Sequence, residues 1–292
     1  MPYMKIMLLT ALSLALFSCD TKSSVSNKGG GGAKIDKING CFNGDPLADN
    51  IVGGTQVNVG DADQKMAVLI IGSSATKIEF CTANVIGRRI LLTAAHCIDP
   101  EFATYAVALY PSVTCASGFK ARQNLVSIQA RARHKNYNDA LSVEQRTDDI
   151  GLFFLKNDLP ADYPTFKIAN PAEINGSDMY LYGYGKTGET GGGVGTLRRA
   201  VLPNSAITLR PEAKLVELNQ QQGVGICQGD SGGAGFVKIG DEMQILGINS
   251  AVARIGGGDL CGGQGFQTTA YEYKDWIEAT IKDNGTVDPL SR

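Results

Sequence analysis

Short apolar runs separated by polar turn residues make up most of the chain from position 51 onwards. The runs are rich in branched and aromatic residues, which is typical of β-strands, and they cover 67–71, 90–92, 104–109, 125–131, 151–155, 179–182, 197–201, 235–237 and 244–249. Helical segments do not alternate regularly with these runs, which argues against a parallel α/β sheet. The pattern therefore favours an all-β body.

A different periodicity covers residues 271–282. Tyr273, Trp276, Ile277 and Ile281 recur at helical spacing and would lie on one face. We therefore predict a helix near the C-terminus that packs this apolar face against the β body.

The N-terminal region has the pattern of an export signal. Lys5 precedes an apolar run at 6–17 that is too short to span a bilayer and fits a signal-peptide core. The Leu-Phe-Ser-Cys sequence that ends at Cys19 resembles the cleavage box of bacterial lipoproteins, which implies that Cys19 carries lipid. A plain secretory signal is the alternative. Residues 20–40 include four consecutive glycines and predict a flexible tether.

Composition narrows the classes of function. The 292 residues carry a net charge of −2, so neither nucleic acid nor a polybasic membrane surface is expected as a partner. Seven cysteines are an odd number for an exported chain, and lipid on Cys19 would leave six for three disulfides. With only two histidines and no Cys-x-x-Cys pair, we expect no metal and no cofactor.

Four short motifs occur in a fixed order along the chain. They are Ile-Val-Gly-Gly at 51–54, Thr-Ala-Ala-His-Cys at 93–97, Asp-Ile-Gly-Leu at 149–152 and Gly-Asp-Ser-Gly-Gly at 229–233. Together they resemble the chymotrypsin-like (trypsin-fold) serine endopeptidases over residues 51–282. The resemblance implies two antiparallel Greek-key β-barrels packed side by side, with a C-terminal helix.

The resemblance also implies how the chain is divided. Residues 1–18 would be the signal peptide and 19–50 a lipid-anchored linker and propeptide. The N-terminal barrel would cover 51–165, and the C-terminal barrel with its helix would cover 166–292. The boundary falls in the proline-rich segment 159–171.

The catalytic roles follow from the same resemblance. A serine hydroxyl is a poor nucleophile and needs a base that is itself oriented. Ser231 would be the nucleophile, His96 the general base and Asp149 the orienting acid. Asp148 is adjacent, but the family places the acid directly before Ile-x-Leu. The backbone N–H groups of Gly229 and Ser231 would form the oxyanion hole.

Activation is implied by the motif at Ile51. In the family, cleavage before this motif frees an amine that inserts into the body and pairs with an aspartate, here Asp230. The intact chain would then be a zymogen. Asn50 precedes the site in place of Arg or Lys, so trypsin-type activation is not expected and the activating protease stays open.

Two disulfides are implied by the family pattern. Cys81 would pair with Cys97 beside the histidine, and Cys227 with Cys261 beside the serine. The remaining pair, Cys41 and Cys115, would keep a cleaved propeptide attached to the body. The alternative is that one of these two is a free thiol.

The resemblance places four residues around the specificity pocket. They are Gly225 at the floor, Ser250 at the entrance, and Val252 and Gly265 at the walls. The lack of an acid at 225 and the valine at 252 predict a preference for small or medium uncharged residues such as Ala, Val, Thr or Leu. Asp259 is an open alternative that could bring a negative charge inward.

The sequence thus predicts a serine endopeptidase that acts through an acyl-enzyme on protein or peptide substrates. It would be exported, activated by another protease and anchored to a bacterial envelope membrane through Cys19, or else secreted. The alternative is a catalytically silent lipoprotein of the same fold that binds a partner. An α/β-hydrolase is excluded by the order of the triad residues. Departures from the family pattern are Met179 and the Thr-Ala-Asn sequence at 82–84.

Overall fold

The computed structural model describes residues 34–35, 42–43, 51–115, 125–143 and 145–283. The chain divides into two units, 1–32 and 33–292, and the described residues all belong to the second. The predictions for the signal peptide, for Cys19 and for Cys41 therefore lie outside the described residues. Lys34–Ile35 (β1) pairs antiparallel with Phe42–Asn43 (β2).

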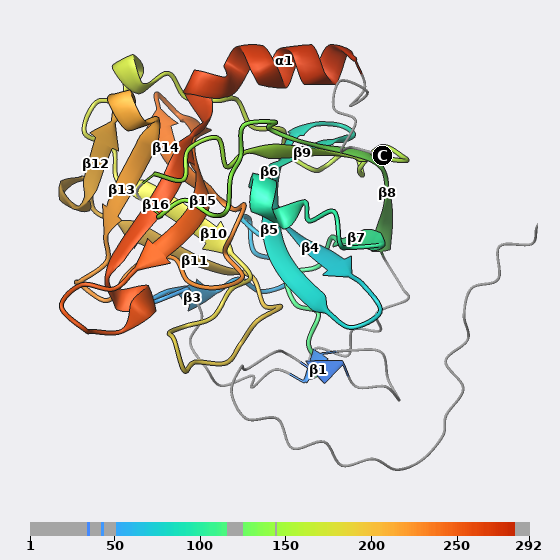
Figure 1. Cartoon of the computed structure of the whole chain (residues 1–292), viewed down its shortest axis with the longest axis horizontal. Coiled ribbons are helices and arrows are strands. Elements are labelled where there is room, and N and C mark those ends of the chain that lie inside the picture. The colour runs from blue at the N-terminus through green and yellow to red at the C-terminus, as the bar shows by residue number, and fades with distance from the viewer. Residues whose placement is uncertain (1–33, 36–41, 44–50, 116–124, 144, 284–292) are drawn as a thin grey trace, which may run out of the picture. The chain divides into compact units, whose positions relative to one another are not determined.

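Six strands close into an antiparallel barrel, shown with its strand labels in Figure 1. The strands are β4 (Val68–Ser73), β5 (Ile78–Gly87), β6 (Ile90–Thr93), β7 (Thr104–Ala108), β8 (Leu125–Arg133) and β9 (Gly151–Leu155), in the spatial order β4-β5-β6-β9-β8-β7. Closure pairs every strand on both sides and leaves no open sheet edge.

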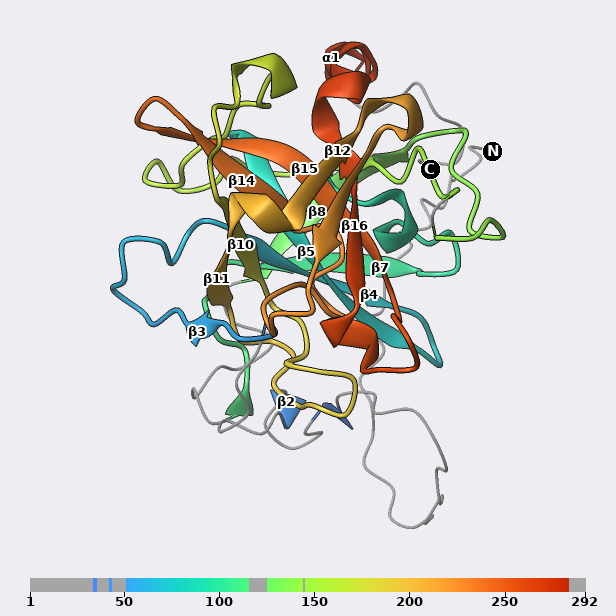
Figure 2. The same cartoon turned by 90° about the vertical axis from the view of Figure 1, so that its left-hand side faces the viewer.

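A second antiparallel sheet has eight strands, and Figure 2 turns it toward the viewer. Its spatial order is β12 (Ile207–Arg210), β13 (Leu215–Asn219), β16 (Gln264–Thr269), β15 (Glu242–Ala253), β14 (Ala234–Ile239), β10 (Met179–Gly183), β11 (Arg198–Leu202) and β3 (Thr55–Gln56). This sheet curls, but its strand pairing ends at β12 and β3 and does not close. The segment after Ile51 therefore joins the second sheet, although it precedes the first barrel in the chain.

The strand patterns follow from the position of each strand. All five residues of β9 are buried, because β9 lies between β6 and β8 in the closed barrel and its sequence is continuously apolar. In β11, Arg198, Ala200 and Leu202 are buried while the residues between them are exposed, as expected for a strand with one covered face.

One hydrophobic cluster spans both sheets, and a second cluster, which includes Ile51 and Leu181, lies in the second sheet. Buried side chains of the barrel, such as Phe153, belong to the same cluster as Phe236 and Tyr184 from the second sheet. The segment at 159–171, where the boundary was predicted, runs between them. The N–H of Phe166 bonds to β5, and Ile168 forms a bridge with Ile245 of β15.

The C-terminal helix α1 (Lys274–Lys282) follows a 3₁₀ turn, η7 (Ala270–Tyr273). Tyr273 and Ile277 are buried in the shared core, and Trp276 and Ile281 pack against it, so the predicted apolar face is the packed face. Further 3₁₀ turns in the described residues are η1 (Ala95–Cys97), η3 (Pro171–Glu173), η4 (Asn204–Ala206), η5 (Pro211–Ala213) and η6 (Leu260–Gly262). Within the described ranges, no helix is long and apolar enough to cross a membrane.

The predicted all-β class with a C-terminal helix is confirmed. Each apolar run named above overlaps a strand, although β14 and β15 are longer than predicted, and β1, β2, β3, β5, β12, β13 and β16 were not predicted. β1 lies within residues 20–40, for which only a flexible tether was predicted. The sequence of β16, Gln-Gly-Phe-Gln-Thr-Thr, shows why, because its polar residues Gln267 and Thr268 are fully buried and hide the apolar signal.

Candidate active site

Neighbouring strands bring His96 and Asp149 together. His96 lies in η1, just after β6, and Asp149 lies just before β9, which pairs with β6 so that Thr93 faces Gly151. The carboxylate of Asp149 accepts the backbone N–H of His96 at 2.9 Å, and its second oxygen lies 2.8 Å from His96 Nδ1.

The pair is electrically coupled and largely shielded from solvent. Asp149 is fully buried, which by itself favours its neutral form, but the charge and hydrogen bonds of His96 and the Ser250 hydroxyl outweigh this and lower its pKa. Ser250 Oγ donates to Asp149 Oδ2 at 2.5 Å. Burial also opposes the charged form of His96, but the Asp149 carboxylate outweighs burial and raises the pKa of His96, against a smaller opposing effect of Arg146.

Asp148, the adjacent acid, has different partners. Its backbone is left-handed, with φ of 60°, and its N–H donates to the Tyr273 hydroxyl at 2.9 Å. Its Oδ1 lies 3.3 Å from Nδ1 of His134. The structure therefore pairs Asp149 with His96 and Asp148 with the other histidine.

The Ser231 loop is held against the barrel by Thr82 of β5. The N–H of Thr82 donates to the Ser231 carbonyl at 2.7 Å, and the Thr82 hydroxyl donates to the Gly229 carbonyl at 3.0 Å. Gly232, with φ of +79°, lies so close to Thr93 and Ala94 that any side chain would collide with them. The loop is thereby fixed against the strand and turn that carry the histidine.

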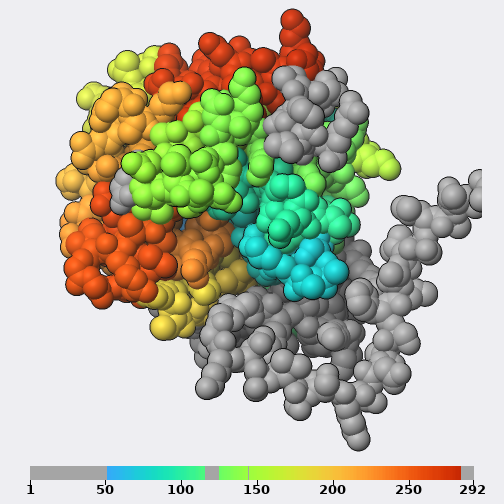
Figure 3. All heavy atoms as spheres, viewed as in Figure 1, coloured from blue at the N-terminus to red at the C-terminus, as the bar shows by residue number. Residues whose placement is uncertain are grey.

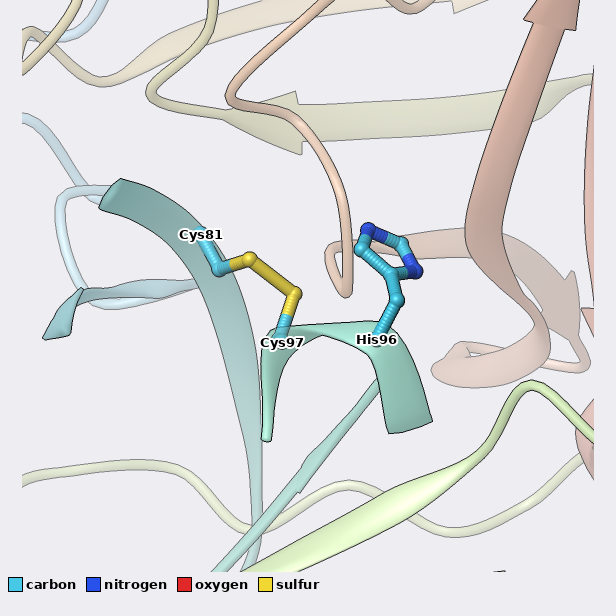
Figure 4. A group of neighbouring side chains, drawn as sticks. All are labelled: Cys81, His96 and Cys97. Atoms are coloured by element: carbon cyan, nitrogen blue, oxygen red, sulfur yellow. A yellow bond between two sulfur atoms is a disulfide. The ribbon is translucent and has the colours of Figure 1, made fainter. Parts of the chain in front are cut away.

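A disulfide connects the strand that carries Thr82 to the turn that carries His96. It links Cys81, the neighbour of Thr82, to Cys97, the neighbour of His96, and Figure 4 shows the imidazole rising from the same turn. The ligand atoms of His96, Cys81 and Cys97 lie within 4.8 Å of one another. Because both sulfurs are in the disulfide, this group has no thiolate for a metal.

Two backbone N–H groups beside the serine have no protein acceptor within the described part of the chain. They belong to Gly229 and Ser231, the pair predicted as oxyanion donors. Gly229 has φ of +97°, and a Cβ there would lie 2.8 Å from Cα of Gly185, so the turn requires glycine. Such donors stabilise an oxygen on which negative charge develops.

Asp230 is fully buried, and its carboxylate accepts two backbone N–H groups. Gly185 donates to Oδ1 at 2.7 Å and Cys227 to Oδ2 at 2.9 Å. Burial raises the pKa of Asp230 to about 7, although these two bonds and the charge of Arg198 act in the opposite direction. Ile51 is also fully buried, but its nitrogen is a peptide nitrogen in the intact chain, so the predicted ammonium–Asp230 pair requires cleavage.

A pocket of about 250 Å³ opens beside Ser231. It is lined by Val143, Arg146, Ile226, Cys227, Gln228, Ser231, Asn249, Ser250, Ala251, Val252 and Leu260. Figure 3 shows the green segment around residue 143 beside the orange segment around residue 252. Ser250 and Val252, two of the residues predicted for the specificity pocket, are thus among those that line it. A second disulfide, Cys227–Cys261, joins the lining residue Cys227 to η6, the turn that begins at Leu260.

Three other predictions for the pocket have a different outcome. Gly225 and Gly265 are not among the lining residues, because the side chain of Gln220 lies against both of them. Asp259 does not line the pocket either. Its carboxylate accepts the N–H groups of Cys261 and Gly262 within η6 and that of Glu189.

Comparison with known proteins identifies the family. A family model described as Trypsin matches residues 51–277, most of the chain. The chain belongs to the trypsin family. It is therefore a serine protease, and the predicted hydrolase activity is confirmed at that level.

Several curated members of the trypsin family are similar to this chain. Trypsin Tyr p 3.0101 of Tyrophagus putrescentiae is 26% identical, over 81% of this chain and 82% of that protein. Coagulation factor XI of Bos taurus is 26% identical over 79% of this chain but only 38% of its own length. Phenoloxidase-activating enzyme 1 of Spodoptera litura is 27% identical over 81% of this chain and 68% of its own.

A solved structure of HL collagenase matches with a TM-score of 0.62 and 17% identity, over 80% of this chain and 99% of that one. At this identity the match supports the fold alone. The Cys81–Cys97 and Cys227–Cys261 disulfides of this trypsin-family chain suit an oxidising compartment and so agree with export. Cys115 is also disulfide-bonded, but Cys41 lies outside the described residues, so their pairing stays a prediction.

Sequence reasoning missed the polar residues that support the Ser231 loop. Asn84 of β5 is fully buried, donates to the carbonyls of Leu92 and Gly232, and accepts the N–H of Ala234. Asn249 donates to the Asp230 carbonyl at 2.9 Å. The available signal was an asparagine inside an otherwise apolar run, as in Leu-Gly-Ile-Asn-Ser at 246–250. Asparagine is disfavoured in strands, so its presence in a buried strand indicates that its side-chain amide is hydrogen-bonded.

Proposed function

We propose that this trypsin-family protease cleaves peptide bonds with Ser231 as nucleophile, His96 as general base and Asp149 as orienting acid. The observation that carries the proposal is the two-point contact of Asp149 with the backbone N–H and Nδ1 of His96. This contact leaves the other ring nitrogen, Nε2, to accept the proton of the Ser231 hydroxyl. A base held in this way is what a serine hydroxyl needs to react at neutral pH.

The steps follow from these roles. Ser231 Oγ attacks the scissile carbonyl carbon while its proton passes to His96 Nε2, and the N–H groups of Gly229 and Ser231 stabilise the resulting oxyanion. His96 returns the proton to the leaving amine as the C–N bond breaks, which leaves an ester on Ser231. Water then loses a proton to His96 and attacks the ester, and Ser231 regains its hydroxyl hydrogen. Asp149 stays ionised throughout.

This chemistry is tested with a fluorophosphonate, which reacts only with an activated serine. We expect the processed protein to be labelled on Ser231 and His96→Ala to be labelled far more slowly. Wild-type protein that is folded, processed and unlabelled would favour the catalytically silent alternative.

The proposal includes activation by cleavage before Ile51. In the intact chain, the carboxylate of Asp230 is buried, and the charge that acts on it from the described residues is that of Arg198. A new ammonium at Ile51 would supply a partner for that carboxylate. Removing one partner of such a buried ion pair typically lowers the folding stability by about 3–5 kcal/mol, so the pair is strong enough to hold a loop in one conformation. N-terminal sequencing of the active protein should begin at Ile51, and activity without cleavage would contradict activation.

The proposed substrates have a small or medium uncharged residue before the scissile bond. Val252, Leu260 and Ile226 give the pocket apolar walls, and Asp259 is engaged in η6. A peptide-library profile should therefore be dominated by Ala, Val, Thr or Leu. Dominance of Arg or Lys would contradict the uncharged pocket, and dominance of Phe or Tyr would show that Val252 does not block it.

The anchor completes the proposal. Lipid on Cys19 and a Cys41–Cys115 bridge would keep the body on the membrane after cleavage at Ile51, because multi-chain lipid anchoring is stable. Fractionation of processed protein tests this. Release of the body by a mild reductant, or in Cys41→Ser, is expected. A processed body that is wholly soluble without reductant would contradict the bridge or the anchor.

A further inference from the structure

The space behind the pocket is filled by one side chain. A Cβ on Gly225 would overlap Cγ, Cδ and Oε1 of Gln220, and a Cβ on Gly265 would lie 2.5 Å from the same Oε1. The two glycines therefore face each other across the Gln220 amide. Their missing side chains are what makes room for it.

Gln220 is held there by a complete set of hydrogen bonds. It is fully buried, Nε2 donates to the carbonyls of Ile226 at 3.1 Å and Cys261 at 2.7 Å, and Oε1 accepts the N–H of Ile226 at 2.8 Å. Both amide hydrogens are thus used. Its backbone is also fixed, because the N–H of Gln220 donates to the Gly263 carbonyl.

These contacts place Gln220 directly behind the pocket wall. Ile226 lines the pocket, and Cys261 is disulfide-bonded to Cys227, which also lines it. The amide bridges the backbone of these two segments. It therefore occupies the volume into which a longer substrate side chain would otherwise extend.

We propose that Gln220 is the residue that sets the depth of the pocket and leaves its inner end uncharged, so that the protease selects a small or medium uncharged residue before the scissile bond. This inference rests on the proposed function, since it requires that the pocket beside Ser231 receives that residue. The amide has no spare N–H for an acidic side chain and no charge for a basic one. Arg146 is the one charged residue among those that line the pocket.

The test compares Gln220→Ala with Gln221→Ala, a neighbouring variant whose wild-type side chain is exposed. Residues 46–50 are replaced by an enteropeptidase site so that every variant is processed to Ile51. Active sites are titrated with fluorophosphonate, and kcat/KM is measured for peptides that differ only in Phe or Ala before the scissile bond. We expect Gln220→Ala to raise the Phe-to-Ala ratio by about tenfold or more, the size of effect that pocket methylenes produce. Gln221→Ala should keep the wild-type ratio.

A second variant covers the case in which Gln220→Ala does not fold. Gln220→Asn keeps an amide but shortens the side chain by one methylene, so the Phe-to-Ala ratio should also rise, by less than in Gln220→Ala. An unchanged ratio in folded Gln220→Ala, or in folded Gln220→Asn where the alanine variant does not fold, overturns the role of Gln220. These outcomes differ from failure of the proposed function, in which wild-type protein neither titrates nor cleaves.

Discussion

Asp149 holds His96 at two points, through the backbone N–H at 2.9 Å and through ring Nδ1 at 2.8 Å. The two contacts use different carboxylate oxygens, so they fix the position of the turn and the orientation of the ring together. One of these oxygens also accepts the Ser250 hydroxyl. The geometry therefore links a residue before β9, a residue after β6 and a residue of β15.

Replacing the acid should change both the rate and its pH dependence. Asp149→Asn removes the charge that raises the pKa of His96, so burial would then lower that pKa. Since the base must be neutral, activity rises with pH through the His96 pKa, and the variant's rise should move to lower pH. We expect kcat to fall by about 10⁴-fold, because an amide favours the wrong tautomer. A pH–rate profile of residual kcat/KM checks this, and an unmoved acidic limb would contradict the coupling.

Arg146 should have the opposite effect on the same limb. Its guanidinium donates to the carbonyl of Asp139 at 2.9 Å, and its charge disfavours protonated His96. Arg146→Gln should therefore move the acidic limb to higher pH, by less than Asp149→Asn moves it to lower pH, because the Arg146 side chain is partly exposed and its charge is screened. The measurement is the same profile at low salt, with Arg133→Gln as control. A shift to lower pH would contradict this reading of the charge.

The sequence was sufficient to predict the fold class, and its contiguous motifs picked out His96 and Asp149, which the structure brings into contact. The catalytic roles of these residues and of Ser231 stay a proposal. Most strands followed from short apolar runs such as 151–155, whereas the barrels were implied by the family resemblance. The supports of the site could not be predicted in this way. Asn84 and Gln220 act through partners more than thirty residues away or through the volume left by glycines, and neither leaves a periodic signal.

Asp230 predicts a pH-dependent stability of the intact chain. Burial raises its pKa to about 7 in the folded state from an ordinary value of 3.8, so between about pH 4 and pH 7 the native state keeps a proton that the unfolded chain has released. The free energy of unfolding should therefore fall as pH rises through this window. At 1.36 kcal/mol per unit, the fall is on the order of 4 kcal/mol.

This stability prediction is checked by urea unfolding at pH 5 and pH 8 in a Ser231→Ala background, which prevents self-cleavage. The fall should be smaller after processing to Ile51 and smaller in Asp230→Asn, where only the part due to the raised pKa of His96 remains, whereas Asp241→Asn, at an exposed site, should retain the full fall. A fall of wild-type size in Asp230→Asn would assign the effect to another group.

Asn84 should be needed for both stability and activity. Asn84→Ala would leave the N–H of Ala234 and the carbonyls of Leu92 and Gly232 without their partner. Each buried group left unpaired costs about 1–3 kcal/mol, so we expect a loss of roughly 3 kcal/mol or more in unfolding free energy and a lower kcat. Urea unfolding and kinetics of Asn84→Ala measure this, with exposed Asn138→Ala as control. Wild-type stability in Asn84→Ala would contradict the role assigned to these bonds.

The central claim is that Ser231 is the nucleophile, and hydrolysis by Ser231→Ala tests it most directly. The measurement is kcat/KM of the purified, folded variant, processed to Ile51, against the wild-type protein on one peptide substrate. The account predicts loss of nearly all activity. The remaining rate should exceed the uncatalysed rate by about 10³–10⁴-fold, because the oxyanion donors and substrate binding still act. Undiminished hydrolysis by the folded Ser231→Ala protein would contradict the account.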